Sequence, residues 1–270
     1  MKMLKLNRDN YHSLEANRQY MSSSLFKGFL PQYGGCEART MAILAGDWEE
    51  KEKTALLVGQ YVHAWNDGSL GKFIEKHRPE IYTRQNTLRA DFVLADKMIE
   101  TLKNDPLITK AREGEKEVIL TGELFGMPWK CMIDIYNPAL RTFSDIKTCR
   151  EINRRYFNET TRQWQSFIEY YGYDWQMAIY AEIERQNRDE VDYFKPHIIA
   201  VSKEDPPDKM LIHFGTEFIE ETLTEIGLFA PAIKAVWEGA VEPMRCERCD
   251  YCRATKVLTK TVYFKDICPA

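Results

Sequence analysis

Apolar residues recur every three or four positions in several stretches of the chain, the spacing of one face of an α-helix. Residues 54–65 carry such an apolar stripe, and residues 91–102 repeat it. A further helix should begin near the serines of residues 21–25, because serine is a favoured N-cap residue ahead of an apolar series. We therefore expect a helix at each of these three places.

Between residues 115 and 147 the apolar period changes to two. The segments there are short, rich in β-branched or aromatic residues, and separated by glycines or by Asn137-Pro138. This pattern predicts three consecutive strands in hairpin or meander order. The expected strands cover residues 115–120, 128–135 and 141–147.

Helices and strands alternate in the rest of the chain. We expect a long helix over residues 164–185, bent near Gly172, then strands at 197–202 and about 210–214, and a helix over 217–237. The order of helices, three strands, helix, strands and helix predicts an α+β or mixed α/β domain built in layers.

Composition and charge restrict the class of protein. The chain has 270 residues, 44% apolar and 29% charged, which is ordinary for a soluble globular protein. We see no signal-peptide core and no run of membrane-spanning length, so we expect a cytoplasmic protein. Residues 1–240 are assigned to one domain, and residues 241–270 to a Cys-rich segment packed on it. The net charge of −4 gives no global attraction to a polyanion, although an acidic surface can surround a locally basic channel.

Two aspartates and a lysine on the predicted strands form the first candidate site. Asp145 and Lys147 should share a strand face, because they are two residues apart. Asp134 lies on the neighbouring strand, so two carboxylates can converge on a hard cation such as Mg²⁺. A lysine beside them can orient or deprotonate a water and neutralise charge on a phosphodiester under attack. A lone D-x-K tripeptide is more often an exposed pair on a solvated strand, so a catalytic interpretation depends on the other motifs in the chain.

Four motifs in one order narrow the class. A G-x₃-H motif ends at His63, Asp134 follows, a D-x-K motif ends at Lys147, and a Q-x₃-Y motif begins at Gln176. This order resembles the RecB-like branch of the PD-(D/E)xK nucleases. That resemblance implies a restriction-endonuclease-like core, with a central mixed sheet flanked by helices.

The flanking sequence resembles a narrower group, the RecE-type exonucleases of phages and prophages. The similar stretches include residues 29–39, 56–59 and 249–253, and the resemblance spans about residues 20–255. It implies a double-strand DNA exonuclease that works beside a single-strand annealing protein.

The resemblance also assigns metal ligands. Asp134, Asp145 and the carbonyl of Ile146 would hold the ion, with His63 approaching it and Glu117 completing the site as in lambda-exonuclease-like members. A histidine on an apolar helix is more often a core or surface residue, and Glu117 fits a solvated strand face equally well.

Gln176 and Tyr180 are four residues apart, so they lie on one face of a helix. Packing alone would explain Tyr180, which lies among apolar neighbours. The resemblance instead has both side chains contact DNA phosphate or the active-site network.

Four arginines near the D-x-K motif are candidate DNA contacts. Arginine contacts to phosphate supply most of the DNA affinity that does not depend on sequence. Nothing resembles a base-reading element, so we expect cutting without sequence preference; solvated loops are the alternative for each arginine. These residues are Arg150, Arg154, Arg155 and Arg162.

Cysteines form the second candidate site. Cys246, Cys249 and Cys252 are spaced by two residues, and Cys36 lies far upstream. Thiolates at this spacing can wrap one metal centre, as in zinc and iron–sulfur sites. Helicase-associated and CRISPR-adaptation relatives hold a [4Fe–4S] cluster with one cysteine before the nuclease core and three after it, usually with a longer last gap. The sequence leaves iron–sulfur, zinc and no metal open, with Cys268 as an alternative to Cys36.

The expected function is a Mg²⁺- or Mn²⁺-dependent double-strand DNA exonuclease with two ions at its site. Cutting from 5′ to 3′, a ring-shaped homo-oligomer, and a RecT-like annealing partner that receives the 3′ strand in phage-type recombination follow from the resemblance alone. The rivals are another RecB-like nuclease, such as an end-processing nuclease of CRISPR adaptation, and a non-catalytic DNA-binding module. Intact Asp134, Asp145 and Lys147 favour an enzyme over the second rival.

Overall fold

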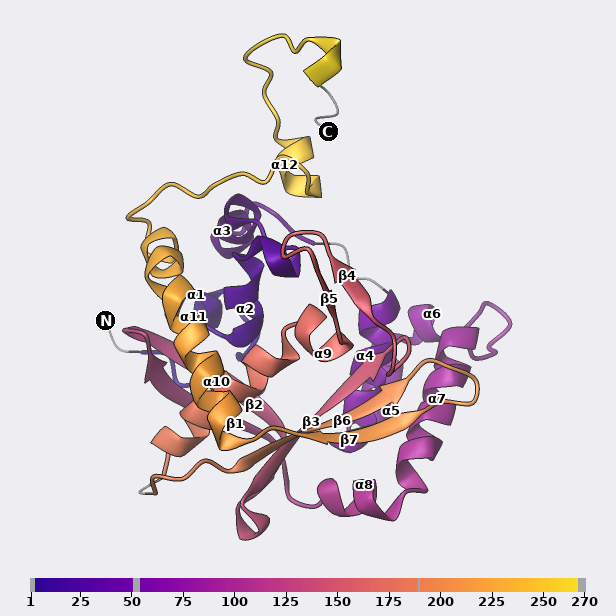
Figure 1. Ribbon diagram of the computed structural model, residues 1–270. Helices are drawn as coiled ribbons and strands as arrows, with labels where there is room; N and C mark the ends of the chain where they lie inside the picture. The colour runs from indigo at the N-terminus through magenta and orange to yellow at the C-terminus, as the bar shows by residue number, and fades with distance from the viewer. Residues whose placement is uncertain (1–2, 51–53, 189, 267–270) are drawn as a thin grey trace.

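A computed structural model describes residues 3–50, 54–188 and 190–266 of the chain (Figure 1). Five strands form the central sheet in the order β1-β2-β3-β6-β7, and β4 and β5 form a separate hairpin. The strands are β1 (Glu115–Leu124), β2 (Met127–Asn137), β3 (Thr142–Cys149), β4 (Tyr156–Asn158), β5 (Gln163–Gln165), β6 (Lys195–Ser202) and β7 (Lys209–His213).

Helices precede, interrupt and follow the strands. The α-helices are α1 (Leu14–Gln19), α2 (Ser23–Gly28), α3 (Glu37–Ala45), α4 (Thr54–Asn66), α5 (Leu70–Lys76), α6 (Arg78–Ile81), α7 (Ala90–Lys103), α8 (Pro106–Ala111), α9 (Phe167–Tyr170), α10 (Tyr173–Gln186), α11 (Thr216–Trp237) and α12 (Asp250–Ala254). The 3₁₀ turns are η1 (Pro31–Tyr33), η2 (Pro138–Leu140) and η3 (Phe264–Asp266).

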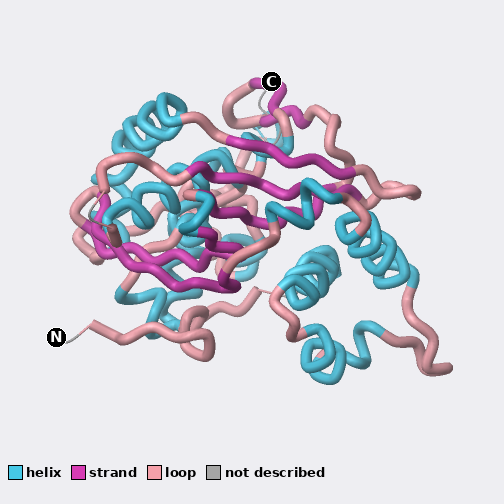
Figure 2. The backbone as a smooth tube through the Cα atoms, turned by 90° about the horizontal axis from the view of Figure 1, so that it is seen from below, coloured by secondary structure: helices cyan, strands magenta, loops and turns pink. Residues whose placement is uncertain are grey.

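The central sheet is mixed and covered on both faces. The pair β3–β6 is parallel, whereas β1–β2, β2–β3 and β6–β7 are antiparallel. One apolar cluster joins one face to α2, α10 and α11, and a second joins the other face to α4, α7 and α8. Along β6, Ile198 packs in the first cluster and Ile199 in the second, as the strand period requires. Figure 2 shows helices on both sides of the strands. The predicted mixed fold is confirmed.

Most of the predicted elements occur, with one clear error. The helix predicted over residues 164–185 is wrong at its start, because Gln163–Gln165 is a strand that pairs antiparallel with β4. Ser166 then caps α9 in a capping box with Glu169, and Gly172, at φ 63°, separates α9 from α10. A three-residue strand is too short to show an alternating period, and so the sequence pattern missed it.

The chain beyond α11 returns to the body of the protein near α3. The short helix α12 packs against α3, and Figure 1 shows the segment after α12 extending away from the sheet. A division of the chain at residue 240 stays a prediction. None of the helices in the described ranges is both long and apolar enough to cross a membrane.

Candidate active site

Strands β2 and β3 separate where the two aspartates lie. Their ladder ends at the pair Ile135–Ser144, while β2 stays paired with β1, and β3 with β6, well beyond it. Met21 fills part of the freed edge of β2 with main-chain hydrogen bonds of 2.8 and 2.9 Å. The two strands therefore open into a fork, with Asp134 on one arm and Asp145 on the other. We refer to these two aspartates and their partners His63, Ile146, Lys147 and Gln176 as the fork.

On the first arm, Asp134 replaces the missing ladder bond with its side chain. Its Oδ2 accepts the Ile146 N–H at 2.8 Å and lies 3.2 Å from Nδ1 of His63 on α4. Burial opposes ionisation of Asp134, but His63, Lys147 and the Ile146 N–H outweigh it, so the Asp134 pKa is lowered. Burial likewise disfavours the His63 cation, yet Asp134 raises the His63 pKa. The pairing thus favours the ionised form of Asp134 and the protonated form of His63.

On the second arm, Asp145 is almost fully buried between a lysine and a glutamine. Lys147 Nζ lies 2.6 Å from Asp145 Oδ2, and Gln176 Nε2 on α10 donates to Oδ1 at 2.6 Å. Burial is the main cause of a raised Asp145 pKa, and Asp134 adds to it, although Lys147 acts in the opposite direction. The Lys147 ammonium also lies 4.6 Å from the centre of the Tyr173 ring. A carboxylate that is costly to ionise and a buried ammonium thus stabilise one another.

The helices that deliver these partners lie on opposite faces of the sheet. The helix α4 packs against β3, and a Cβ at Gly59 would lie 3.5 Å from Thr148 Oγ1. One turn later, the same helix brings His63 to Asp134. From the other face, α10 brings Gln176 to Asp145. The G-x₃-H and Q-x₃-Y motifs therefore meet at the fork although more than a hundred residues separate them.

The candidate metal ligands of the fork, Asp134 and Asp145, are paired with His63 and Lys147. Asp145 Oδ2 is buried and, apart from its ion pair with Lys147, makes no hydrogen bond to any residue that the structure describes. This buried acceptor fits a cation site. However, within the described ranges the only set of three or more Cys, His, Asp or Glu ligand atoms that lie within 4.8 Å of one another is formed by cysteines. Asp134, Asp145, His63 and Glu117 do not converge in this way, because each aspartate is paired with its own cationic side chain.

Glu117 lies beside the first arm of the fork. On β1 it lies opposite Asp134, between the paired residues on either side, and its backbone has φ 54°. The Glu117 Oε2 is 3.2 Å from Nε of Arg8. Burial, and then hydrogen bonding to Asp67, raises the Glu117 pKa to about 7. Asp67 directly follows α4, and no motif in the sequence marks it as a site residue. Glu117 is therefore near the fork, but it interacts with Asp67 and Arg8.

Tyr180 lies deeper in the core than its motif partner Gln176. It is 9% exposed and hydrogen-bonds Tyr11 through its side chain. Burial raises its pKa well above the usual value. This placement favours packing support behind Asp145, and a direct DNA contact from Tyr180 stays a prediction. Ile146 likewise contacts Asp134 through its N–H, whereas its carbonyl was the predicted ligand.

Three of the four predicted DNA-binding arginines flank or lie on the β4–β5 hairpin, which the sequence did not reveal. Arg155 lies 6.0 Å from the ring centre of Trp164, which is 59% exposed, and Arg162 lies 5.7 Å from that of Phe157. Arg154 similarly stacks on a tyrosine of β4. The hairpin thus presents cations and aromatic rings together on an exposed surface. Arg150, also exposed, follows directly after β3.

Lys27, at the end of α2, is a site neighbour that sequence reasoning missed. Its Nζ donates to the carbonyls of Tyr171 at 2.8 Å and Gly172 at 3.1 Å. Burial, followed by repulsion from Lys147, lowers its pKa to about 7. A Cβ on Gly172 would lie 2.7 Å from a Lys27 side-chain carbon and 2.9 Å from the Tyr33 ring. No local pattern in the sequence marks Lys27, because its contacts join segments about 145 residues apart.

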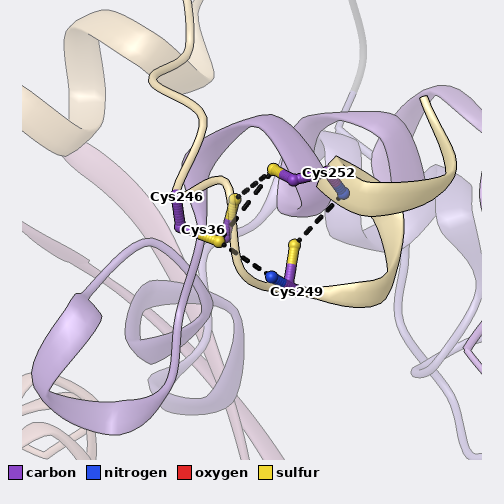
Figure 3. Close-up of side chains that lie close together, drawn as sticks. All are labelled: Cys36, Cys246, Cys249 and Cys252. Carbon is purple, nitrogen blue, oxygen red and sulfur yellow. Dashed lines mark hydrogen bonds between the residues drawn. The ribbon is translucent and has the colours of Figure 1, made fainter. Parts of the chain in front are cut away.

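Four cysteines from the two ends of the chain meet at α3 (Figure 3). The sulfurs of Cys36, Cys246, Cys249 and Cys252 all lie within 4.8 Å of one another. Cys36 Sγ is 3.6 Å and Cys246 Sγ is 3.9 Å from Cys252 Sγ. We call these four residues the cysteine cluster. The alternative ligand Cys268 lies outside the described residues.

Comparisons with known proteins give a consistent class. Residues 22–255 match the family described as a PDDEXK-like domain of unknown function, DUF3799. The crystal structure of a candidate exonuclease from Eubacterium rectale is similar, with 39% sequence identity, 97% of this chain and 98% of that chain covered, and a TM-score of 0.91. The structure of SSO0001 shares 15% identity over 85% of this chain and 93% of that one, at a TM-score of 0.32 that carries no argument. No curated protein matches the chain.

The chain therefore belongs to the DUF3799 family of PDDEXK-like domains, and it is an enzyme of the PD-(D/E)xK nuclease class. Nucleases of this class use divalent metal ions, and the fork contains the paired acidic residues and lysine that name the class. The individual roles of the fork residues stay predictions.

Proposed function

We propose that the protein is a Mg²⁺-dependent exonuclease that hydrolyses double-stranded DNA from its ends. The fork carries this proposal: Asp134 on one strand binds the N–H of Ile146, the neighbour of Asp145 on the other strand, and Lys147 lies 2.6 Å from Asp145. The similarity of the chain to the candidate exonuclease from Eubacterium rectale supports hydrolysis from DNA ends. Mn²⁺ is the expected substitute ion, since it accepts the same oxygen ligands.

Asp134 and Asp145 would hold the metal, with the Ile146 carbonyl, His63 and Glu117 as further ligands. A bound Mg²⁺ would supply Lewis acidity towards the scissile phosphate, and a pair of ions would act on both attacking and leaving oxygens. Ligation by Asp134 requires that its pair with His63 loosen. Loss of the imidazole proton would end that attraction and leave a neutral nitrogen able to bind metal.

Lys147 is the residue assigned to the charge that develops during hydrolysis. Its side chain is largely buried, and its raised pKa, which Asp145 causes against the effect of burial, keeps it protonated at neutral pH. A preorganised cation in a water-poor fork stabilises transition-state charge more than a solvated one does. Gln176 would orient Asp145 through its 2.6 Å hydrogen bond.

The β4–β5 hairpin supplies a surface for the DNA. Arg154, Arg155 and Arg162 can neutralise phosphates, and the exposed ring of Trp164 can stack on a base. Arg150 extends the basic surface towards the fork. The hairpin is held in place by Asn158, whose amide donates to the Gln32 carbonyl at 2.9 Å. We extend the proposal to 5′→3′ resection, a ring-shaped homo-oligomer and a RecT-like partner, all on the RecE-type sequence resemblance.

Cleavage of linear and of covalently closed DNA distinguishes this proposal from the alternatives. Linear duplex DNA and a covalently closed circle of the same sequence should be incubated with the protein and Mg²⁺, and acid-soluble nucleotides followed with time. We expect the linear form to be degraded and the circle to be spared; blocking one 5′ end should slow loss of that strand. Linearisation of the circle would indicate an endonuclease, and no cleavage of either form would favour a non-catalytic DNA-binding module.

A further inference from the structure

We propose that Cys36, Cys246, Cys249 and Cys252 bind one zinc ion as four thiolates, and that this ion fastens residues 246–254 to α3. The proposal concerns the cysteine cluster alone and does not depend on the function proposed for the fork. Sequence spacing left zinc, an iron–sulfur cluster and no metal open. The distances between sulfurs favour zinc over an iron–sulfur cluster.

A single tetrahedral ion requires sulfurs that are close together. Zinc–thiolate bonds of about 2.3 Å at tetrahedral angles place any two sulfurs about 3.8 Å apart. The Cys36–Cys252 and Cys246–Cys252 sulfurs are 3.6 and 3.9 Å apart, and no pair in the cysteine cluster exceeds 4.8 Å. The two pairs at 3.6 and 3.9 Å therefore match edges of a ZnS₄ tetrahedron, and the 4.8 Å upper bound leaves room for the other pairs to close onto the same ion.

An iron–sulfur cluster requires wider spacing. In a [4Fe–4S] cube each cysteine binds a different iron and points outwards, which places the four cysteine sulfurs about 6 Å apart. A [2Fe–2S] rhomb brings sulfurs together only in pairs and keeps the two pairs comparably far apart. All four sulfurs of the cysteine cluster are closer than either arrangement allows.

The backbone around the sulfurs is also organised for ligation. The Cys249 N–H points at Cys246 Sγ at 3.3 Å, and the Cys252 N–H points at Cys249 Sγ at 3.4 Å. Such N–H groups stabilise thiolates and orient them towards a bound ion, in the manner of an outer shell of a metal site. Two successive x₂ turns therefore present three sulfurs from one short segment, and Cys36 at the N-terminus of α3 supplies the fourth.

The apolar contacts of the segment are few. Among the described residues its apolar cluster has three buried members, Cys36, Ala38 and Cys252, and Tyr251 packs edge-on against Trp48 at 5.5 Å, which is far less than a stable core requires. A few hydrogen bonds also join the two parts, such as the Ala38 N–H to the Met244 carbonyl at 3.1 Å and the Met244 N–H to Glu37 Oε2 at 2.8 Å. A zinc ion would supply the missing free energy, as it does in small metal-dependent folds.

The zinc site would in turn support the surroundings of the fork. The Cys36 N–H donates at 2.8 Å to the carbonyl of Gly28, which ends the helix that carries Lys27. The turn η1, between Cys36 and α2, holds the β4–β5 hairpin through the Gln32 carbonyl. The ion would therefore stabilise the base of the DNA-binding hairpin without contacting substrate.

Metal analysis without DNA tests the proposal. The protein should be produced with both iron and zinc supplied, purified anaerobically, and measured for zinc, iron and acid-labile sulfide. We expect one zinc per chain, no sulfide, and loss of the zinc in Cys246→Ser. Cys131→Ser is the matched control, because Cys131 is buried in the core away from the cysteine cluster and should leave the zinc content unchanged.

A second measurement covers the case in which Cys246→Ser fails to fold. In the parent protein, replacement of zinc by Co²⁺ should give the intense sulfur-to-metal charge-transfer band and the visible bands of a tetrahedral thiolate site. Iron with sulfide and a broad brown absorbance would overturn the proposal in favour of a cluster. Absence of tightly bound metal, or a cobalt spectrum typical of octahedral oxygen ligation, would also overturn it.

Discussion

The fork and the cysteine cluster both gather candidate metal ligands from distant parts of the chain, but they do so in opposite ways. At the fork, each carboxylate is paired with a cationic side chain, and the ligand atoms do not converge. In the cysteine cluster, four sulfurs converge within 4.8 Å, with main-chain N–H groups directed at two of them. A site that must exchange ions and admit substrate keeps open positions, whereas a structural site is closed by its own ligands.

The largest expected effect comes from removing each metal separately. A brief treatment with EDTA should abolish DNA cleavage while leaving the thermal midpoint of unfolding almost unchanged, and added Mg²⁺ should restore cleavage. Release of zinc from the cysteine cluster by a mercurial reagent should instead cost at least about 3 kcal/mol of stability, roughly 10 °C in Tm. Calorimetry and a cleavage assay on the same samples check this. Equal loss of Tm under both treatments would erase the distinction between the two sites.

A smaller effect, on DNA affinity, is expected from a change in the β4–β5 hairpin. Trp164→Ala should weaken binding of DNA with a single-stranded end about tenfold, because base stacking on an exposed aromatic ring contributes roughly 1–3 kcal/mol. Trp164→Phe should restore most of the affinity, since it keeps a ring. Fluorescence anisotropy in Ca²⁺ measures binding without turnover. If all three proteins bind equally, the hairpin does not contact the DNA.

The smallest effects distinguish two glycines beside the fork. Gly172→Ala should lower stability by about 1–2 kcal/mol, because Gly172 has φ 63° and a Cβ would overlap Lys27 and Tyr33. Gly59→Ala should leave stability unchanged or raise it by up to about 1 kcal/mol, since a Cβ there would lie 3.5 Å from Thr148 Oγ1, an ordinary contact distance, within a helix. Denaturant unfolding compares the two variants. A larger loss for Gly59→Ala would show that α4 approaches β3 more closely than described.

The sequence predicted the residues of the fork but not its shape. Period-two strands and the D-x-K spacing were enough to place Asp134, Asp145 and Lys147 on neighbouring strands. The point at which β2 and β3 separate, beyond the pair Ile135–Ser144, was not predictable from the sequence. Where two strands separate depends on how each of them pairs with its other neighbour in the sheet. The hydrogen bond from Ile146 to Asp134 follows from that separation.

Contacts between residues far apart in the sequence also could not be predicted from the sequence. Lys27 and Asp67 approach the site through tertiary packing, and nothing in their local sequence distinguishes them from surface residues. The pattern around the short strand β5 predicts the start of a helix, so the exposed position of Trp164 beside Arg155 is not evident from the sequence. In the cysteine cluster, spacing predicted that the thiols would gather, whereas only sulfur–sulfur distances could favour zinc over iron–sulfur.

The most direct test of the fork as the nuclease site is the rate at which Lys147→Ala degrades linear duplex DNA in Mg²⁺. The account predicts a fall of at least about a hundredfold, because the variant removes a preorganised cation from the developing charge, with DNA binding in Ca²⁺ retained. Lys97→Ala is the matched control, since that lysine is exposed on α7 and pairs with Asp205, and it should cleave at the parent rate. Digestion by Lys147→Ala at close to the parent rate would contradict the assignment.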